Sequence, residues 1–399
     1  ALRDAEEAVL EYRSQRSPAV DLGAYVPGET GADAAVYVVA RLLEVRGLEE
    51  DVRAAKALEH LEWIYGQRLQ LALRGREGLL ARIPDADHAV YREARMRLRA
   101  ARARGSEVAK ALAAFDRVVK RLRRTHPALA ALAFPLPPRM SDVQQALKPG
   151  EVLLLLLDDG RVSAVVAVTR KQARLRPYDP NKPLDSVRDL LQGARRLLVV
   201  PDGARTAAPL ENAPWEKGRV LDAFEVAYVP SAASLVRLRG LPPSQAAPGK
   251  QVLGEGELPA GPIANLQLDW PAVFELAQPA ATRLEAPGGS LAAVRLRERR
   301  IEADLVVLPK GRLVRGWRTH GSGVTVLAEA LAVAGARSVL LAVAGEPDPQ
   351  LLQRFYKNRL EHKQAPAAAL REAKLWFRKQ PGGKGPGAWA GLILYGLPD

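Results

Sequence analysis

The chain has 399 residues, and none of them is cysteine. A protein without thiols forms no disulfide bond, binds no metal through thiolates and has no cysteine nucleophile. The absence of cysteine is compatible with reducing and with oxidising compartments. The opening stretch ALRDAEEAVLEY has the pattern of a charged helix rather than of a secretory signal, and a removed signal or a longer parent chain is left open. The compartment is not fixed by the sequence, and a cytoplasmic location is favoured.

Long apolar runs and paired histidines are missing as well. The strongest apolar run, Val152 to Leu157, has the length of a strand and is far short of the roughly 18 residues of a membrane-spanning helix. None of the five histidines stands at the paired spacing that metal ligation needs. The glycine-rich stretch PGGKGPGAW lacks the residue order of phosphate-binding loops. We therefore expect no membrane span, no metal and no cofactor.

Positive charge is in excess, with 59 lysines and arginines against 45 aspartates and glutamates, which gives a formal net charge of +14. An excess of this size could attract nucleic acid or anionic lipid. The basic residues alternate with alanine and leucine, however, as on the solvated outer faces of helices. We therefore expect a protein partner rather than nucleic acid. The densest group comprises Arg92, Arg95, Arg97, Arg99, Arg102, Arg104, Lys120, Arg121, Arg123 and Arg124.

The chain changes character twice. Residues 1–125 carry apolar residues at three- and four-residue spacing, which predicts an all-α helical domain, with two of its helices around Gly105. The helix lengths resemble degenerate helical repeats, although no repeat unit is convincing. Residues 126–150 contain five prolines and predict a connecting segment with one short helix at residues 141–147. Residues 151–399 alternate short apolar runs with helical patterns and predict an α/β domain.

The second half of the chain holds the strands of a predicted sheet. EVLLLLLDDGRVSAVVAV predicts two strands joined by a tight turn, because Asp-Gly tolerates positive φ. Further strands are predicted in RRLLVVP, EVAYV, KQVL, EADLVVLP, RSVLLAV and AGLILYG. Helices are predicted between them, one ending near Gly193, one capped by Ser231 and one over residues 268–277. Because the strands are apolar on both faces, we expect a central sheet covered by helices.

From about residue 130 onwards, the ordered segments resemble a CHAT domain, a bacterial member of the caspase and separase clan that commonly follows tetratricopeptide-type helices. The resemblance is carried by GEVLLLLLDDGRVSAVVAV, RRLLVVPDGARTAAPLENAP, FEVAYVPSAASLVRL, IEADLVVLP, GSGVTVLAEALAVAGARSVLLAV and the C-terminal pieces up to GAWAGLILYG. No single piece suffices, and the order of the pieces carries the likeness. It implies a caspase-like central sheet flanked by helices at residues 151–399.

The resemblance also implies a Cys-His dyad that cleaves peptide bonds, in which the imidazole keeps the thiol as thiolate. The nucleophile loop of the family follows the strand ADLVVL and corresponds here to Pro309, Lys310 and Gly311. Gly311 stands at the nucleophile position. Arg312 and Leu313 follow where the family has acidic and hydroxyl residues. The whole loop departs from the family pattern, so we predict no catalytic residue in it.

The histidine of the dyad is missing too. The stretch AQPAATRLEAPGG, residues 277–289, was the segment expected to lead to it, and no histidine occurs between His126 and His320. His320, in RTHGSG, lies after the nucleophile strand rather than before it. A dyad of His320 with Ser322 is not favoured, because two residues so close on one loop rarely meet in attack geometry.

These departures predict a non-catalytic pseudo-protease that serves as a protein-binding or scaffold component. Two alternatives stay open: a peptidase with a substitute serine or threonine nucleophile, and nucleic-acid binding by the basic helical domain. Caspase-like proteins have basic pockets on the side of the sheet where the nucleophile strand ends, so the resemblance implies that Lys310, Arg312 and Arg315 are candidates for receiving an acidic peptide. The other candidates for peptide or partner contacts are Asp202, Trp317 and His320.

Overall fold

The structure, a computed structural model, describes most of the chain. The described residues are 29–45, 47–72, 83–126, 130, 134, 136–158, 160, 162–202, 209–242, 244–246, 249–255, 258–259, 261–275, 278–314, 323–343, 345–383 and 385–399. Arg315, Trp317, His320 and Ser322 lie outside them. In this part of the chain, no helix is both long enough and apolar enough to cross a bilayer.

The chain forms two compact units. The first comprises Ala1–Val38 and Arg74–Leu136, and the second comprises Val39–Leu73 and Pro137–Asp399. The second unit thus takes in a helical segment that the sequence groups with the first helices. The domain limits near residues 125 and 150 stay a prediction.

Two helices form the described core of the first unit. They are α5, Asp85–Arg104, and α6, Val108–Thr125, which confirms the pair predicted around Gly105. Gly105 ends α5 in the left-handed conformation, with φ of 66°, which glycine adopts without strain. The rings of Tyr91, Phe115 and Phe134 meet between the helices at centroid distances of 5.7 to 6.5 Å. Whether the helices are degenerate repeats stays a prediction.

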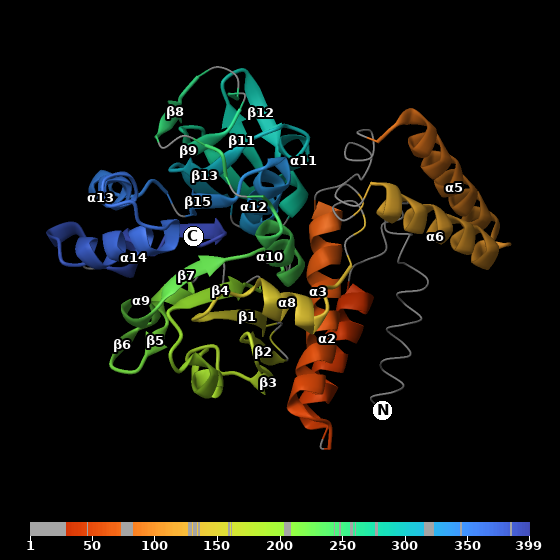
Figure 1. Ribbon diagram of the computed structural model, residues 1–399, viewed down its shortest axis with the longest axis horizontal. Helices are drawn as coiled ribbons and strands as arrows, with labels where there is room; N and C mark the ends of the chain where they lie inside the picture. The colour runs from red at the N-terminus through yellow and green to blue at the C-terminus, as the bar shows by residue number, and fades with distance from the viewer. Residues whose placement is uncertain are drawn as a thin grey trace. The chain divides into compact units, whose positions relative to one another are not determined.

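The second unit is built on a sheet that has ten strands in the described residues, in the order β3-β2-β1-β4-β7-β16-β15-β13-β9-β8 (Figure 1). β1, β4, β7 and β16 are parallel to one another, as are β8, β9, β13 and β15, and the two sets meet where β16 pairs antiparallel with β15. The strands of one set therefore end at the edge of the sheet where the strands of the other set begin. The strands are β1 Glu151–Asp158, β2 Ser163–Val168, β3 Ala173–Pro177, β4 Arg196–Val200, β7 Glu225–Tyr228, β8 Gln251–Leu253, β9 Ile263–Leu268, β13 Ala303–Leu308, β15 Ser338–Ala342 and β16 Leu392–Gly396.

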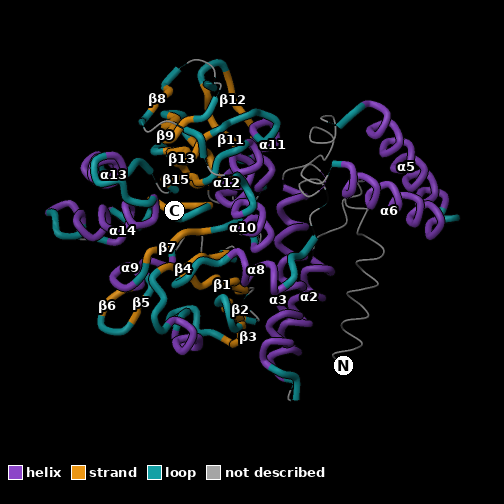
Figure 2. The backbone as a smooth tube through the Cα atoms, viewed as in Figure 1, coloured by secondary structure: helices purple, strands orange, loops and turns teal. Residues whose placement is uncertain are grey.

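Helices surround this sheet, as Figure 2 shows by colour. They are α8 Met140–Ala146, α9 Val220–Ala223, α10 Ala232–Arg239, α11 Ala293–Leu296, α12 Gly323–Ala334, α13 Pro349–Leu360 and α14 Pro366–Phe377, with short 3-10 turns η2 Asp185–Leu191, η4 Leu210–Asn212, η5 Pro279–Ala281, η6 Pro381–Gly383 and η7 Pro386–Ala388. The central strands are buried on both faces, and seven of the eight residues of β1 are buried, whereas the edge strand β8 is largely exposed. The predicted fold class, an α/β central sheet flanked by helices and preceded by helices, is confirmed.

Smaller sheets complete the described fold. β10 Ala272–Glu275, β11 Arg283–Ala286, β12 Gly289–Ala292 and β14 Gly311–Val314 form a four-stranded sheet, and β5 Pro214–Trp215 pairs with β6 Gly218–Arg219. β14 follows β13 after two residues and pairs in parallel with β10. The four-stranded sheet is therefore connected directly to the end of β13 through β14.

α2, Glu29–Glu44, precedes α3, Glu50–Ala72, which packs against the sheet within the second unit. The first turn of α3 covers the edge strand β3, because Oδ1 of Asp51 accepts a hydrogen bond of 2.9 Å from the backbone N–H of Ala173. Further along α3, the buried carboxylate of Glu62 accepts the backbone N–H groups of Ala232 and Ala233 at 2.6 and 2.9 Å. These are first-turn donors of α10 that have no partner within their own helix. Side chains of α3 thus satisfy main-chain groups at both places.

Several predicted local features are confirmed. β1 and β2 form the hairpin that Asp-Gly predicts, with Asp158 opposite Ser163, and Gly160 has φ of 83°. Ser231 caps α10 by accepting the N–H of Ser234 at 3.0 Å. The helix predicted over residues 268–277 is wrong, because β9 ends at Leu268 and Ala272–Glu275 form the strand β10. The helix before Gly193 is a 3-10 helix rather than an α-helix.

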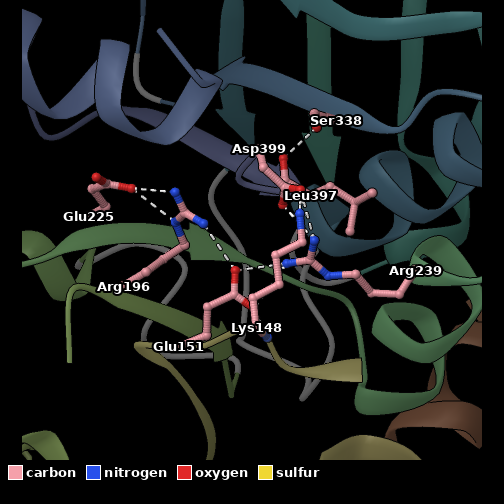
Figure 3. A network of polar contacts seen from close by, with 8 residues as sticks. All are labelled: Lys148, Glu151, Arg196, Glu225, Arg239, Ser338, Leu397 and Asp399. Carbon is pink, nitrogen blue, oxygen red and sulfur yellow. Dashed lines mark hydrogen bonds and ion pairs between the residues drawn. The ribbon is translucent and has the colours of Figure 1, made fainter. Parts of the chain in front are cut away.

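A network of charged side chains links the starts of β1, β4 and β7 to the C-terminal residue (Figure 3). The carboxylate of Glu151, 1% exposed, lies 3.0 Å from a guanidinium nitrogen of Arg196 and 2.8 Å from one of Arg239. Arg196 also binds Glu225 at 2.7 Å, and Arg239 binds Asp399 at 2.6 Å. The network joins segments that are far apart in sequence.

Candidate functional site

The chain segment at the predicted nucleophile position is a tight connection between two sheets. β13 ends at Leu308, the chain passes through Pro309 and Lys310, and β14 begins at Gly311. The carbonyl of Lys310 accepts the N–H of Ala272 at 2.7 Å, and the carbonyl of Gly311 accepts the N–H of Gly345 at 2.8 Å. Main-chain hydrogen bonds thus tie this segment to β10 on one side and to the segment after β15 on the other.

Position 311 has no room for a side chain. A Cβ atom on Gly311 would lie 1.5 Å from the carbonyl oxygen of Ala342 and 3.0 Å from Cε2 of Phe274. A contact of 1.5 Å with a carbonyl oxygen cannot exist in a packed interior without movement of the main chain. The φ angle of Gly311 is not in the left-handed region, so the position requires glycine for space and not for conformation.

The side chains beside Gly311 do not converge. Lys310 is half-buried, and Arg312 is 64% exposed and lies 3.6 Å from a carboxylate oxygen of Glu285 on β11. Glu285 is also 3.6 Å from Arg283, so this exposed carboxylate is shared by two arginines. What the connection presents to solvent is therefore positive charge and no nucleophile.

The strand end next to this connection belongs to β9, which runs parallel to β13 with Gln267 opposite Val307. The hydroxyl of Tyr356 donates to Oε1 of Gln267 at 2.8 Å, and Nε2 of Gln267 donates to Oδ1 of Asp269 at 2.6 Å. Burial, followed by the charge of Asp269, raises the pKa of the Tyr356 hydroxyl. A phenol, an amide and a carboxylate thus bind one another at the strand end beside β13.

A dyad requires its two side chains within hydrogen-bonding reach, so a histidine partner would have to lie near the end of β13. The stretch 277–289, where the sequence placed the approach to the histidine, forms η5, β11 and the start of β12 in the four-stranded sheet. None of these elements pairs with β13. That assignment is wrong, and β9 is the strand that ends beside β13.

Asp202 is not brought together with Lys310 and Arg312. It follows β4, whose carboxyl end lies on the opposite side of the sheet from the carboxyl end of β13. Its side chain is buried, and Oδ2 accepts the backbone N–H of Asp158 at 2.8 Å. Asp202 therefore links the end of β4 to the end of the neighbouring strand β1. The remaining predicted contacts, Arg315, Trp317 and His320, lie outside the described residues.

The most deeply buried ion pair joins Lys374 of α14 to Glu211 of η4, with Nζ 3.0 Å from Oε1. The other oxygen of Glu211 accepts the hydroxyl of Tyr228 at 2.6 Å, and that hydroxyl accepts the N–H of Leu210 at 2.7 Å. Burial and the neighbouring carboxylate raise the pKa of Tyr228 well above its ordinary value. Because these groups satisfy one another inside the protein, the cluster holds α14 in place rather than presenting reactive groups.

The described histidines stand apart from this region. His60 is on α3, His88 is on α5, His126 follows α6 and His362 follows α13. His126 lies 2.9 Å from Asp87, and this contact, followed by Arg121, lowers the pKa of the Asp87 carboxyl. The described residues contain no group of acidic, histidine or cysteine side chains that could hold a metal ion.

Two features of this region were not predicted from the sequence. The alternation Asn265, Gln267, Asp269 is a strand signal with polar residues on one face, and it could have placed β9 correctly. The contact between Ala342 and position 311 has no local signal, since it joins the start of β14 to the end of β15, and α12 lies between these two strands in sequence.

The family model of the CHAT domain matches residues 272–397, from the first residue of β10 to just beyond the end of β16. The match thus includes the β13–β14 connection and Gly311. Comparison with the curated proteins finds no match.

Proposed function

Since the chain carries a CHAT domain, we propose that it is a non-catalytic relative of the caspase-like peptidases and that it works by binding another protein. The closure of the main chain over position 311 carries the proposal, because the carbonyl oxygen of Ala342 occupies the place of a nucleophile's Cβ. The chain has no reactive side chain at position 311 and no space for one there, and both observations support a non-catalytic protein. The sheet stays packed although the nucleophile of the family is missing, and this supports a binding role.

The first test is a search for catalysis. The purified chain is incubated with a broad peptide library, and products are detected by mass spectrometry. We expect no cleavage above that of a buffer blank, and no serine labelled by a fluorophosphonate probe. Reliable cleavage that is abolished by changing one residue, such as Ser322→Ala, would contradict the proposal and favour a substitute nucleophile.

A sharper test restores the missing thiol. Gly311→Cys should be less stable than the parent and should gain no peptidase activity, because its Cβ meets the carbonyl of Ala342. Arg312→Cys is the matched control, since the same thiol then stands on an exposed neighbour. It should react readily with a thiol reagent and leave the stability unchanged. A folded, active Gly311→Cys variant would show that the site is open.

The binding role is tested by comparing variants as baits in the native host. Arg312→Glu reverses the exposed charge at the β13–β14 connection, and Arg300→Glu, at a residue with an 85% exposed side chain, makes the same charge change elsewhere on the CHAT domain. A partner that contacts the connection should be retained by the parent and by Arg300→Glu and lost with Arg312→Glu. Equal retention by all three would place the contact elsewhere.

A further inference from the structure

Three helices of the second unit meet at a pair of buried carboxyl groups. Glu62 of α3 is 3% exposed, and Glu329 of α12 is 9% exposed. Arg237 of α10 lies 3.3 Å from Oε1 of Glu329, and Oε2 of Glu329 accepts the hydroxyl of Ser234 at 2.9 Å. The two oxygens of Glu62 accept main-chain N–H groups of α10, and no lysine or arginine among the described residues pairs with them. The cluster thus contains two carboxyl groups and one guanidinium group.

The charges of this cluster favour the binding of one proton. If both carboxyl groups were ionised, the cluster would bury a net negative charge, and a buried charge without a partner is strongly unfavourable. Since Arg237 contacts Glu329, Glu62 is the carboxyl group that is left to bind the proton. In agreement with this count, burial raises the pKa of Glu62 to about 7, against the effect of its main-chain hydrogen bonds.

The elements packed against α3 supply few other ionisable groups near Glu62. α10 and α12 contribute Arg237 and Glu329, while Arg239 of α10 is bound in the network at the starts of β1, β4 and β7. η5 and the apolar stretches of β1 and β2 have no ionisable side chain. The arginines of β3 pair with Glu50, about three turns of α3 before Glu62. The charge at Glu62 is therefore set mainly within the cluster.

We propose that Glu62 is a latch controlled by a proton, which holds α3 on α10 and α12 while Glu62 is neutral and lets α3 open when Glu62 is ionised. Opening exposes the carboxylate to water and separates it from the charge of Glu329. It also uncovers the first-turn N–H groups of α10 that Glu62 now binds. Because α3 also buries Leu58 and Leu61, the closed state is the stable one, and the proton sets how often α3 opens.

The effect of pH on the latch has a definite sign and size. Once α3 opens, water surrounds Glu62, and its pKa returns to the ordinary value of 4.5. Since the pKa in the closed state is the higher one, the contribution of the proton to closing is complete below about pH 4.5 and is lost as pH rises through about 7. The equilibrium constant for opening should therefore rise about ten-fold between pH 6 and pH 8. This effect does not depend on whether the CHAT domain is catalytic.

The test measures hydrogen exchange of main-chain amides in the intact chain at pH 6 and at pH 8. Each rate is divided by the rate of the same amide in an unstructured chain at that pH, which removes the intrinsic effect of pH on exchange. We expect the protection of Ala232 and Ala233 to fall about ten-fold from pH 6 to pH 8. Leu340, in the centre of β15, should be better protected than both at each pH. Equal protection of all three amides would mean that α3 opens only when the whole unit unfolds, and would overturn the proposal.

Two variants of α3 identify the group that titrates. Glu62→Gln is neutral at both pH values, so the protection of the α10 amides should be the same at pH 6 and pH 8, whatever its level. Glu59→Gln is the matched control, because it makes the same charge change at an exposed residue of the same helix and should keep the ten-fold change. Persistence of the ten-fold change in Glu62→Gln would assign it to another group, such as the buried His60 of α3, and would contradict the proposal.

A variant of α12 tests the cluster without changing Glu62. Glu329→Gln removes the second carboxylate and leaves Arg237 to the charge of Glu62, so the loss of protection should move to lower pH. Circular dichroism of each variant checks that its helices are intact. If Glu329→Gln followed the same pH profile as the parent, the two carboxyl groups would not share one cation, and the charge count behind the latch would be wrong.

Discussion

The β13–β14 connection and the starts of β1, β4 and β7 are both strand ends of one sheet, yet they are stabilised in different ways. At the connection, main chain packs on main chain, and Gly311 leaves its space to the carbonyl of Ala342. At the starts of the three strands, the buried carboxylate of Glu151 lies between the guanidinium groups of Arg196 and Arg239. The sheet is thus held by buried charge at the starts of these strands and by main-chain packing at the β13–β14 connection.

The difference matters for how each region could change. A site that has lost only a side chain can regain it by one substitution, whereas a site that the main chain has filled cannot. The network at the strand starts is the opposite case, because each charged partner there satisfies another.

The largest effect is expected at position 311. Gly311→Ala adds one Cβ atom, which has to push the carbonyl of Ala342 away and break the hydrogen bond from Gly345 to Gly311. We expect the free energy of unfolding in urea to fall by about 4 kcal/mol. Gly385→Ala is the control, since a Cβ there meets nothing within 4 Å, and it should stay within about 0.5 kcal/mol of the parent. An equally stable Gly311→Ala variant would show that the connection is open.

The next effect concerns the network. Glu151→Gln keeps the shape of the side chain but removes the negative charge between Arg196 and Arg239, leaving two guanidinium groups without their shared anion. We expect a loss of about 3 kcal/mol in the free energy of unfolding. Glu44→Gln is the control, because its pair with Arg41 is solvent-exposed and should contribute less than about 1 kcal/mol. Similar losses in both variants would mean that burial of the network does not matter.

The third effect is a dependence on pH that arises from a buried carboxyl without a strong cationic partner. Burial raises the pKa of Glu62 to about 7 from its ordinary value of 4.5, against the lowering effect of its hydrogen bonds from Ala233 and Ala232. Glu329, which is bonded to Arg237, raises it further. Since the folded pKa is the higher one, the neutral carboxyl favours the fold. This contribution is fully present below about pH 4.5 and is lost as pH rises through 7.

The free energy of unfolding should therefore fall by up to about 3 kcal/mol between pH 5 and pH 8 from this group alone. Glu62→Gln is neutral at every pH and should remove that part of the dependence, although its amide replaces only one of the two acceptors. The measurement is urea unfolding of both proteins across this pH range. An unchanged slope in the variant would show that Glu62 does not titrate there.

The sequence predicted the parts of the fold that have local signals. The apolar runs of β1, β4, β13 and β15 are buried on both faces, and their pattern alone fixes them as strands. β10 was not predicted because its four residues are too few to show a period. The fold class could be predicted, whereas short strands could not.

The candidate site was predictable only in part. The sequence shows that position 311 is a glycine and therefore lacks a nucleophile. It does not show that a side chain there would have no space, because the contacting groups of Ala342 and Phe274 are brought there by tertiary packing. The network is equally invisible in the sequence, since Glu151, Arg239 and Asp399 come from distant segments. Asp202 was grouped with the nucleophile loop because the sequence does not show that the two strand sets run in opposite directions.

The smallest effect is expected at the exposed charge of the connection. Arg312 is 64% exposed and lies 3.6 Å from Glu285, which Arg283 also contacts, so solvent and the second arginine compensate for its loss. Arg312→Ala should therefore change the free energy of unfolding by less than about 0.5 kcal/mol, measured in urea beside Gly311→Ala. The losses in the free energy of unfolding at these two adjacent residues would then differ several-fold. This difference is expected if packing at Gly311 holds the connection together and Arg312 is available for binding. A loss at Arg312 comparable to that at Gly311 would mean that charge, and not the main chain, stabilises this strand end.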